Sequence, residues 1–470
     1  MLCLHSCEST QIHSFSSTQE MKQKSEITAM PIIDGNENLY QDCVKILNTY
    51  CEWVVEIYSK AGVIKSMPKE AENPVIPETA IARPGQPGAH ITHADENMDI
   101  KVCASGDQLT RARFAGAKDL RAGAHTARDR FEFCAPFGPV MWHTKASLLQ
   151  YCFHLMFKPS SVNEVGTLKF FREKYNRKNV TPAKVLDSYT GCEELFISAG
   201  KGYLVAALMK FFGMATVDDI PTSHKFSMND KDDFAKEFGL FVETFIFQWK
   251  LPTHTEEDNI MNYGLCMCFL TVLLLQMKDT AAQGDGDRNL INQKLLLSVF
   301  KSLGAFSKYA IEMFVSIAQI EALLTPRLSE QFKWGFYVNW KGGEGNNIED
   351  DLAQEIMNRI VKDIVNHMGA NKTVPSITKV CKAASGIHEI VTNADANFLN
   401  IHETSSKHTI RSAADDERGM IDDILSLDVF QYHASRCHPS FPDIKRSPMR
   451  YMKIVDFHKW IDKQLSYLTQ

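Results

Sequence analysis

The chain has 470 residues, 44% of them hydrophobic and 23% charged, and a formal net charge of −6 at pH 7. This is an ordinary globular composition, with enough material for a large core and for one or two domains. A negative chain has no overall attraction for nucleic acid, so any such binding would need a local basic patch.

The twelve cysteines are scattered and show neither the spacing of a zinc finger nor that of a disulfide scaffold. Reduced thiols in an intracellular protein, nuclear or cytoplasmic, are the simplest explanation. The first residues have no basic region followed by an apolar core, so we expect no secretory signal. No cofactor is indicated by composition alone.

The N-terminal third begins with a polar segment. Residues 1–30 are rich in Ser, Thr, Gln and Lys, which predicts a disordered tail. Residues 38–61 place apolar side chains at three- and four-residue steps, which predicts an amphipathic helix. The prolines of residues 65–97 exclude a continuous helix and indicate a loop or linker. His90 and His93 in this loop precede two acids, and such histidines form hydrated pairs more often than metal sites.

Asp107 follows the next predicted strand. Residues 98–103 alternate between apolar and polar side chains, and the strand is expected to stop at Gly106. A helix is predicted over residues 108–120. One hypothesis makes Asp107 a catalytic carboxylate that binds Mg²⁺, with Gln108 in support, because strand ends hold carboxylates rigidly. The alternative is a cap that accepts backbone N–H bonds from the helix.

Basic side chains on this helix and on two later helices form a candidate nucleic-acid-binding surface. Basic runs on helices are more often solvated faces, and both interpretations stay open at this stage. The candidates are Arg111, Arg113, Lys118, Arg121, Lys145 and Lys362.

A second strand is predicted within residues 131–143, which contain two prolines and the apolar residues 140–142. A helix is expected to follow over residues 144–157. His143 lies at their junction, where it would either position a ligand or form a buried, hydrogen-bonded histidine.

Residues 158–330 show helical periodicity almost throughout. The apolar run at residues 264–275 is too short to span a bilayer and has the length of a buried segment, so no membrane contact is expected. Helices are predicted over residues 192–212, 230–250, 259–278, 289–306 and 308–324.

An extended pattern returns at residues 334–340, followed by the glycine-rich residues 341–347. A helix over residues 348–368 then carries Glu355 and Asn358. Beyond it we expect a helix over residues 376–394, a polar mobile stretch over 400–416 and an amphipathic helix over 451–468.

Three stretches together resemble an uncharacterised eukaryotic family, a domain of unknown function with a GDQLT signature. The resemblance covers about residues 30–465 and brings no established activity. It rests on Gly106-Asp-Gln-Leu-Thr110, on Pro136-Phe137 with Trp142-His-Thr-Lys145, and on residues 338–371, which include Asp351, Glu355 and Asn358.

The order of elements also resembles RNase H-like transposases of the hAT and Mutator type, in which three carboxylates hold two metal ions for phosphoryl transfer. The resemblance implies that Asp107 is the second acid and Glu355 the third, with Mg²⁺ or Mn²⁺ bound if the protein is active. The nearest first acid, Asp34, leads into a helix, and Val140 stands where those transposases have a cysteine. We therefore expect catalysis to be absent. Alternatively, Glu355 is an exposed carboxylate that pairs with Arg359.

The predicted fold is a predominantly helical α/β protein, with a small mixed sheet of RNase H-like type interrupted by a large helical insertion. The predicted function is that of a transposase-derived, inactive protein that binds DNA through a local basic patch. The alternative is a helical scaffold or protein-interaction module. The expected divisions are a disordered tail (1–30), the first part of the core (31–157), the helical insertion (158–330), a return to the core (331–395), and a polar loop with a C-terminal helix (396–470).

Overall fold

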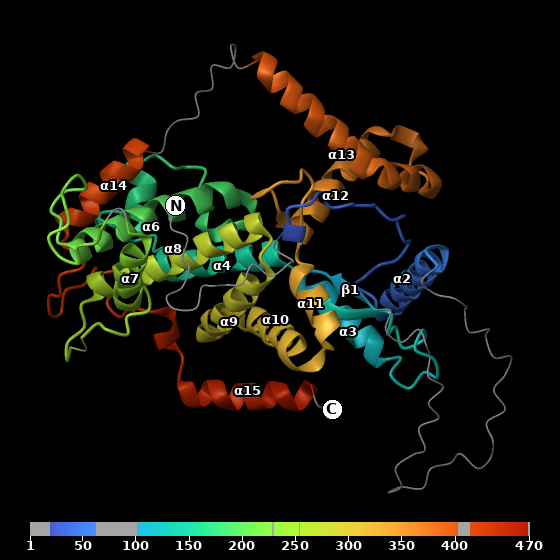
Figure 1. Cartoon of the computed structure of the whole chain (residues 1–470), viewed down its shortest axis with the longest axis horizontal. Helices are drawn as coiled ribbons and strands as arrows, with labels where there is room; N and C mark the ends of the chain where they lie inside the picture. The colour runs from blue at the N-terminus through green and yellow to red at the C-terminus, as the bar shows by residue number, and fades with distance from the viewer. Residues whose placement is uncertain (1–18, 63–100, 228–229, 253, 403–413, 469–470) are drawn as a thin grey trace, which may run out of the picture. The chain divides into compact units, whose positions relative to one another are not determined.

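A computed structural model describes residues 19–62, 101–227, 230–252, 254–402 and 414–468. The protein is predominantly helical, with a few short strands (Figure 1). The proline-rich residues 65–97 with His90 and His93, and residues 403–413, lie outside the described residues.

The chain forms two compact units. The first unit comprises Met1–Met30, Val140–Leu323 and Lys333–Gln470, and the second comprises Pro31–Pro139 and Leu324–Phe332. The boundary after Pro139 lies before the helix that the sequence analysis placed with the first part of the core.

The second unit contains a parallel pair of strands with a helix between them. Strand β1 (Val102–Ser105) pairs with β2 (Cys134–Gly138), and α3 (Gln108–Asp119) lies between them in the chain. Helix α2 (Tyr40–Lys60) packs against α3 and β2. The strand, acid and helix predicted around Asp107 are therefore present.

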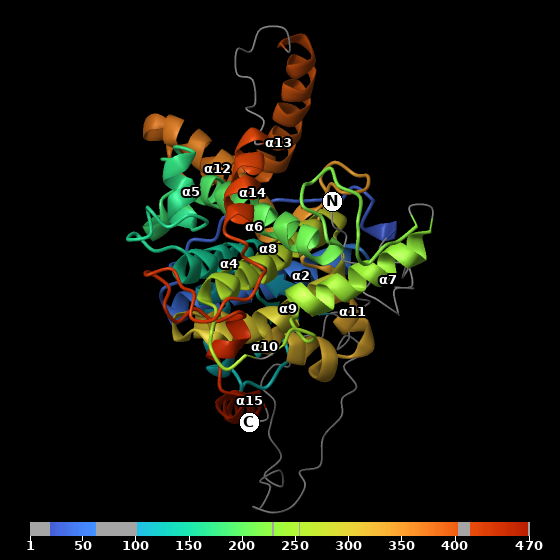
Figure 2. The same cartoon turned by 90° about the vertical axis from the view of Figure 1, so that its left-hand side faces the viewer.

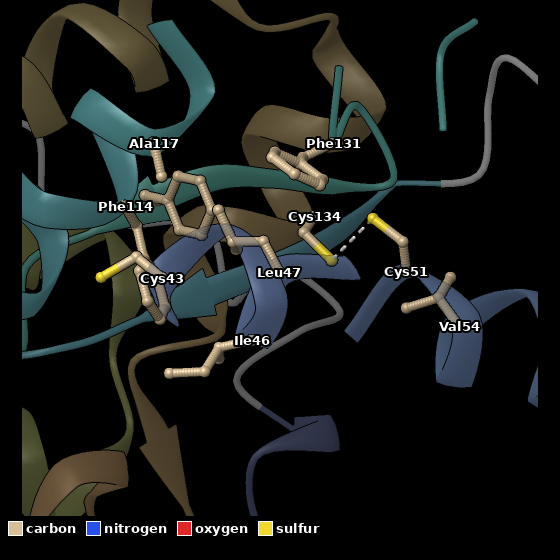
Figure 3. Close-up of a cluster of buried hydrophobic side chains, with 10 residues drawn as sticks. Cys43, Ile46, Leu47, Cys51, Val54, Phe114, Ala117, Phe131 and Cys134 are labelled. Atoms are coloured by element: carbon tan, nitrogen blue, oxygen red, sulfur yellow. Dashed lines mark hydrogen bonds between the residues drawn. The ribbon is translucent and has the colours of Figure 1, made fainter. Parts of the chain in front are cut away.

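The core of the second unit is a cluster of apolar side chains from α2, α3, β2 and the turn before β2 (Figure 3). Cys51 of α2 faces Cys134 of β2, with their Sγ atoms 3.7 Å apart. The buried members are Cys43, Ile46, Leu47, Cys51, Val54, Phe114, Ala117, Phe131, Cys134 and Phe137.

Three helices, α4 (Met141–Met156), α6 (Tyr189–Phe212) and α8 (Asn259–Gln283), contact one another within the first unit (Figures 1 and 2). Helix α8 is buried along most of its length because α4, α6 and α9 all pack against it. Further helices of this unit are α5 (Leu168–Lys174), α7 (Lys231–Phe241), α9 (Gly286–Ser302), α10 (Ser307–Ala318), α14 (Ala414–Ser426) and α15 (Ile454–Leu468).

Shorter helical segments connect these helices. Two are π-helical turns, Val242–Ile246 and Gln319–Leu323. Helix α11 (Pro326–Trp334) crosses the boundary between the two units. The 3₁₀ turns are Pro182–Lys184, Leu186–Ser188, Gly304–Phe306, Gly369–Asn371 and Pro448–Tyr451.

Two helical segments, Leu186–Phe212 and Asn259–Gln283, are long and apolar enough to cross a membrane. In the most apolar window of each, 72% and 83% of the residues are buried inside the protein. Buried core helices pass the same test of length and composition, so this is weak evidence for a membrane span.

The first unit also contains a β-hairpin followed by two helices. Strand β3 (Tyr337–Val338) pairs antiparallel with β4 (Ile348–Glu349), and α12 (Asp350–His367) begins directly after β4. Helix α13 (Val374–His402) packs against α12. The described strands thus form two separate two-stranded sheets, one parallel and one antiparallel, instead of the single mixed sheet that was expected.

Several element boundaries differ from those expected from the sequence, and two of them concern strands. Strand β2 ends at Gly138, and residues 141–143, which were expected in the strand, form the first turn of α4. The extended pattern expected over residues 334–340 is reduced to Tyr337–Val338, because Trp334 still belongs to α11. Short apolar runs have no clear period, so the pattern could not separate a strand from a buried helix start.

Helices α6 and α8 approach closely at Gly200. A Cβ atom added there would lie 1.9 Å from Oγ1 of Thr271, a separation shorter than any real contact. Replacing Gly200 by Ala should therefore force the two helices apart. We expect Gly200→Ala to lower the free energy of unfolding in urea by about 2 kcal/mol.

Gly304→Ala is the matched control, because a Cβ at Gly304 meets nothing within 4 Å. Its stability should stay within about 0.5 kcal/mol of the parent value. Equal stabilities for the two variants would contradict the close approach of α6 and α8.

Candidate functional site

Asp107 lies at the junction between β1 and α3. Strand β1 ends at Ser105, and Asp107 is the N-cap of α3, with its carboxylate accepting a hydrogen bond from the Thr110 backbone N at 2.7 Å. The side chain is exposed. Asp107 therefore caps the helix, which was the alternative to a metal-binding role in the sequence analysis. Gln108 is the first residue of the helix and is partly buried.

The basic side chains of α3 differ in their surroundings. The Arg113 guanidinium donates to Oδ1 of Asn38 at 2.5 Å, and Arg111 is partly buried. The Lys118 ammonium lies over the Phe137 ring, 5.5 Å from its centroid. Arg121 is exposed just beyond the end of α3, one turn after Lys118, and makes no ion pair with any described residue.

Lys118 is close to a second cation. Burial lowers the pKa of Lys118, and the positive charge of Lys101 lowers it further, whereas Glu132 opposes the shift. Neither lysine forms an ion pair within the described part of the chain. We call Lys101, Lys118 and Arg121 the α3 basic cluster. An anion bound there would relieve the repulsion between the two lysines.

Three further predicted site residues, Glu355, Asn358 and Lys362, lie on α12 in the first unit. Glu355 and Lys362 are exposed, and Asn358 Oδ1 accepts a hydrogen bond from Gln354 Nε2 at 2.8 Å. Within the described ranges, Glu355 makes no ion pair with Arg359, although both lie on exposed positions of the helix.

Asp107 and Glu355 belong to different units. Neither unit by itself contains both carboxylates. The described residues also contain no group of three or more His, Cys, Asp or Glu side chains that could hold a metal ion. The metal-binding role of the two acids therefore stays a prediction.

A carboxylate that the sequence analysis left out of the site meets the first turn of α4. Asp351, which is 8% exposed, accepts hydrogen bonds from the backbone N of Trp142 and of His143, each at 3.0 Å. Its Oδ2 atom also lies 2.9 Å from Nδ1 of His143. One carboxylate thus satisfies two unpaired N–H groups of the helix start and orients the imidazole.

A buried ion pair lies beside this contact. Lys145, 8% exposed, pairs with Glu349, which is 3% exposed. Lys145 therefore lies inside the first unit instead of on a surface that nucleic acid could reach. The partners come from positions 204 residues apart, so they join the start of α4 to the end of the β3–β4 hairpin.

Tyr189 extends this polar region. Its hydroxyl donates to Glu193 Oε1 at 2.7 Å, and Lys278 forms an ion pair with the other oxygen of Glu193 at 2.7 Å. Burial raises the pKa of Tyr189, and the charges of Glu193 and Glu349 raise it further. The phenol is therefore a fixed hydrogen-bond donor over the physiological pH range.

Sequence reasoning missed Asp351 and Glu349 as contact residues. The available signal was the acidic run of residues 349–351 directly before a helix, because carboxylates at such positions often cap a helix. The pattern does not show that the capped helix is α4, more than 200 residues earlier.

The model of a family of unknown function, DUF6589, matches residues 8–408 of the chain. The chain belongs to this family. The match includes Asp107, His143, Asp351 and Glu355, and it assigns no activity to any of them. No curated protein matches the chain, and no solved structure does. Because the family has no known function, a function for this DUF6589 protein must be inferred from its own residues.

Asp351→Ala removes the acceptor of three hydrogen bonds at the start of α4. We expect the free energy of unfolding to fall by about 2 kcal/mol, because two backbone N–H groups lose their partner. Asp363→Ala is the control, since Asp363 is an exposed acid on the same helix. Chemical denaturation followed by circular dichroism measures both, and equal losses would contradict the role of Asp351.

Proposed function

We propose that this DUF6589 protein is an intracellular, non-catalytic nucleic-acid-binding protein derived from an RNase H-like transposase. The α3 basic cluster of the second unit would contact the phosphates. The observation that carries the proposal is the proximity of Lys101 and Lys118. Burial and the charge of Lys101 lower the pKa of Lys118, and neither lysine forms an ion pair with a carboxylate among the described residues.

A phosphate backbone fits this arrangement better than a single small anion does. Arg121 lies one turn beyond Lys118 and is exposed, so the cations extend along the end of α3 instead of converging on one enclosed point. Nucleic acid presents negative charges at regular intervals, and phosphate contacts supply most sequence-independent affinity. The net charge of −6 restricts this attraction to a local surface.

The order of elements in the second unit supports the ancestry. The second unit contains a parallel strand pair connected through a helix, and Asp107 lies just after the first strand. This order is expected of a protein with an RNase H-like origin. The long helical stretch that follows and the acid on α12 agree with that order. This is support from order alone, since folds with the same order can differ in function.

Two features support the absence of catalysis. The Asp107 carboxylate already accepts the Thr110 N–H, as an N-cap does. Asp34, the nearest first acid, precedes α2 in an exposed irregular segment instead of lying on a strand. Two-metal catalysis with Mg²⁺ or Mn²⁺ needs several rigidly held carboxylates.

The salt dependence of duplex DNA binding tests the proposal. For the full chain, the logarithm of affinity should fall linearly with the logarithm of salt concentration. Lys101→Ala combined with Arg121→Ala should reduce that slope by about 2, because each lost phosphate contact contributes about 0.9. Fluorescence anisotropy with labelled DNA measures both quantities.

Lys60→Ala is the control, because Lys60 is an exposed lysine of the same unit that pairs with Glu56. It should leave affinity and slope unchanged. Absence of DNA binding, or an equal slope in all three proteins, would contradict the proposal and favour the alternative of a helical scaffold.

A second experiment tests the absence of catalysis. Labelled DNA incubated with the protein and Mn²⁺ should stay intact. Asp107→Asn is the informative variant, because Asn also caps helices well but offers no carboxylate to a metal. Cleavage by the parent protein that is lost in Asp107→Asn would show that the protein is a nuclease. Cleavage that persists in the variant would indicate a contaminant.

A further inference from the structure

The loop between β3 and β4 is built around two buried asparagines. Asn339 is 1% exposed and Asn347 is 4% exposed, and they flank a glycine-rich stretch. Gly342, Gly343 and Gly345 all have positive φ angles, a conformation that favours glycine. We call residues 339–347 the hairpin loop.

Residues 21–25, which we call the arm, lie on this loop and are held mainly through their backbone. The side-chain amides of Asn339 and Asn347 each donate to the carbonyl oxygen of Met21 at 3.1 Å. The backbone N of Gly343 donates to the Lys22 carbonyl at 2.7 Å. The backbone N of Ser25 donates to the Asn339 carbonyl at 2.7 Å, and its hydroxyl accepts from the Asn339 N at 2.9 Å.

The side chains of the arm add charge complementarity. Lys22 pairs with Glu344 of the hairpin loop at 3.0 Å, and Lys24 pairs with Glu389 of α13 at 2.7 Å. The hydrogen bond and the charge of Lys24 lower the pKa of the Glu389 carboxyl. Glu344 and Glu389 therefore bind two lysines of the arm that are separated by one residue in the sequence.

The contact between the arm and the hairpin loop consists of hydrogen bonds and ion pairs, as in a peptide-binding site. The carbonyl oxygen of Met21, which lies within the helical turn of residues 19–23, accepts hydrogen bonds from two side-chain amides that are almost fully buried. Asn347 Oδ1 is buried and has no hydrogen-bond partner, so the loop retains an unused acceptor. Both ion pairs are solvent-exposed and therefore hold the arm weakly.

We propose that the hairpin loop, together with Glu389, is a binding site for a peptide segment that ends a helical turn and carries two lysines one residue apart. The arm fills this site in cis. A second segment with the same chemistry competes with the arm for Asn339, Asn347 and the two acids. The site lies wholly within the first unit, so it is independent of the α3 basic cluster.

Peptide binding to the full chain tests the proposal. The probe is a fluorescent peptide with the sequence of residues 19–28. In the chain that carries Lys22→Glu and Lys24→Glu, Glu344 and Glu389 should repel the arm. The arm should then leave the hairpin loop and free it for the peptide. This variant should bind the peptide at least tenfold more tightly than the parent chain, whose site is occupied.

A charge exchange gives an independent measurement. The chain with Glu344→Lys and Glu389→Lys should bind a peptide with Lys22→Glu and Lys24→Glu more tightly than it binds the original peptide. Adding Asn339→Ala to either variant should abolish binding. Equal affinity of the parent and the arm variant for the original peptide, or binding that ignores the charge of the peptide, would overturn the proposal. So would the absence of binding in both variants.

Discussion

The second unit is organised by the parallel pairing of β1 with β2. Parallel strands cannot be joined by a tight turn and need a crossover, which here contains α3. The pairing fixes both ends of that helix: its first turn follows the end of β1, where Asp107 caps it, and its last turn brings Lys118 over Phe137 of β2. The position of the basic side chains is therefore a consequence of strand pairing, and the proposed phosphate contacts depend on it.

The first unit depends on contacts between segments that are far apart in the sequence. Asp351 caps α4 and orients His143, and Glu349 neutralises the buried Lys145, so the start of α12 is tied to the start of α4. Removing one partner of a buried pair is costly because the remaining charge stays in an apolar environment. One turn further along α12, Glu355 is exposed. Asp351 and Glu349, two acids that precede Glu355 at the start of α12, therefore have structural partners.

Elements with strong local patterns could be predicted from the sequence. The spacing of apolar side chains predicted the helix at residues 259–278, which the structure extends to Gln283, and the alternation before Gly106 predicted the strand that precedes Asp107. The start of α4 could not be predicted, because Asp351, which satisfies its backbone, lies 208 residues away from His143. The binding of the arm to the hairpin loop could not be predicted either, since residues 21–25, which are mostly polar, show no periodic pattern. Pairings over long distances leave no local signal.

The chain belongs to DUF6589, a family of unknown function. The α3 basic cluster is therefore the feature from which we infer a function. We propose that nucleic acid contacts the second unit at the end of α3. Hydrogen–deuterium exchange of the full chain, with and without duplex DNA at low salt, tests this contact most directly. We expect slower exchange at residue 101 and over residues 108–121 when DNA is present. Unchanged exchange there, or protection confined to the first unit, would contradict it.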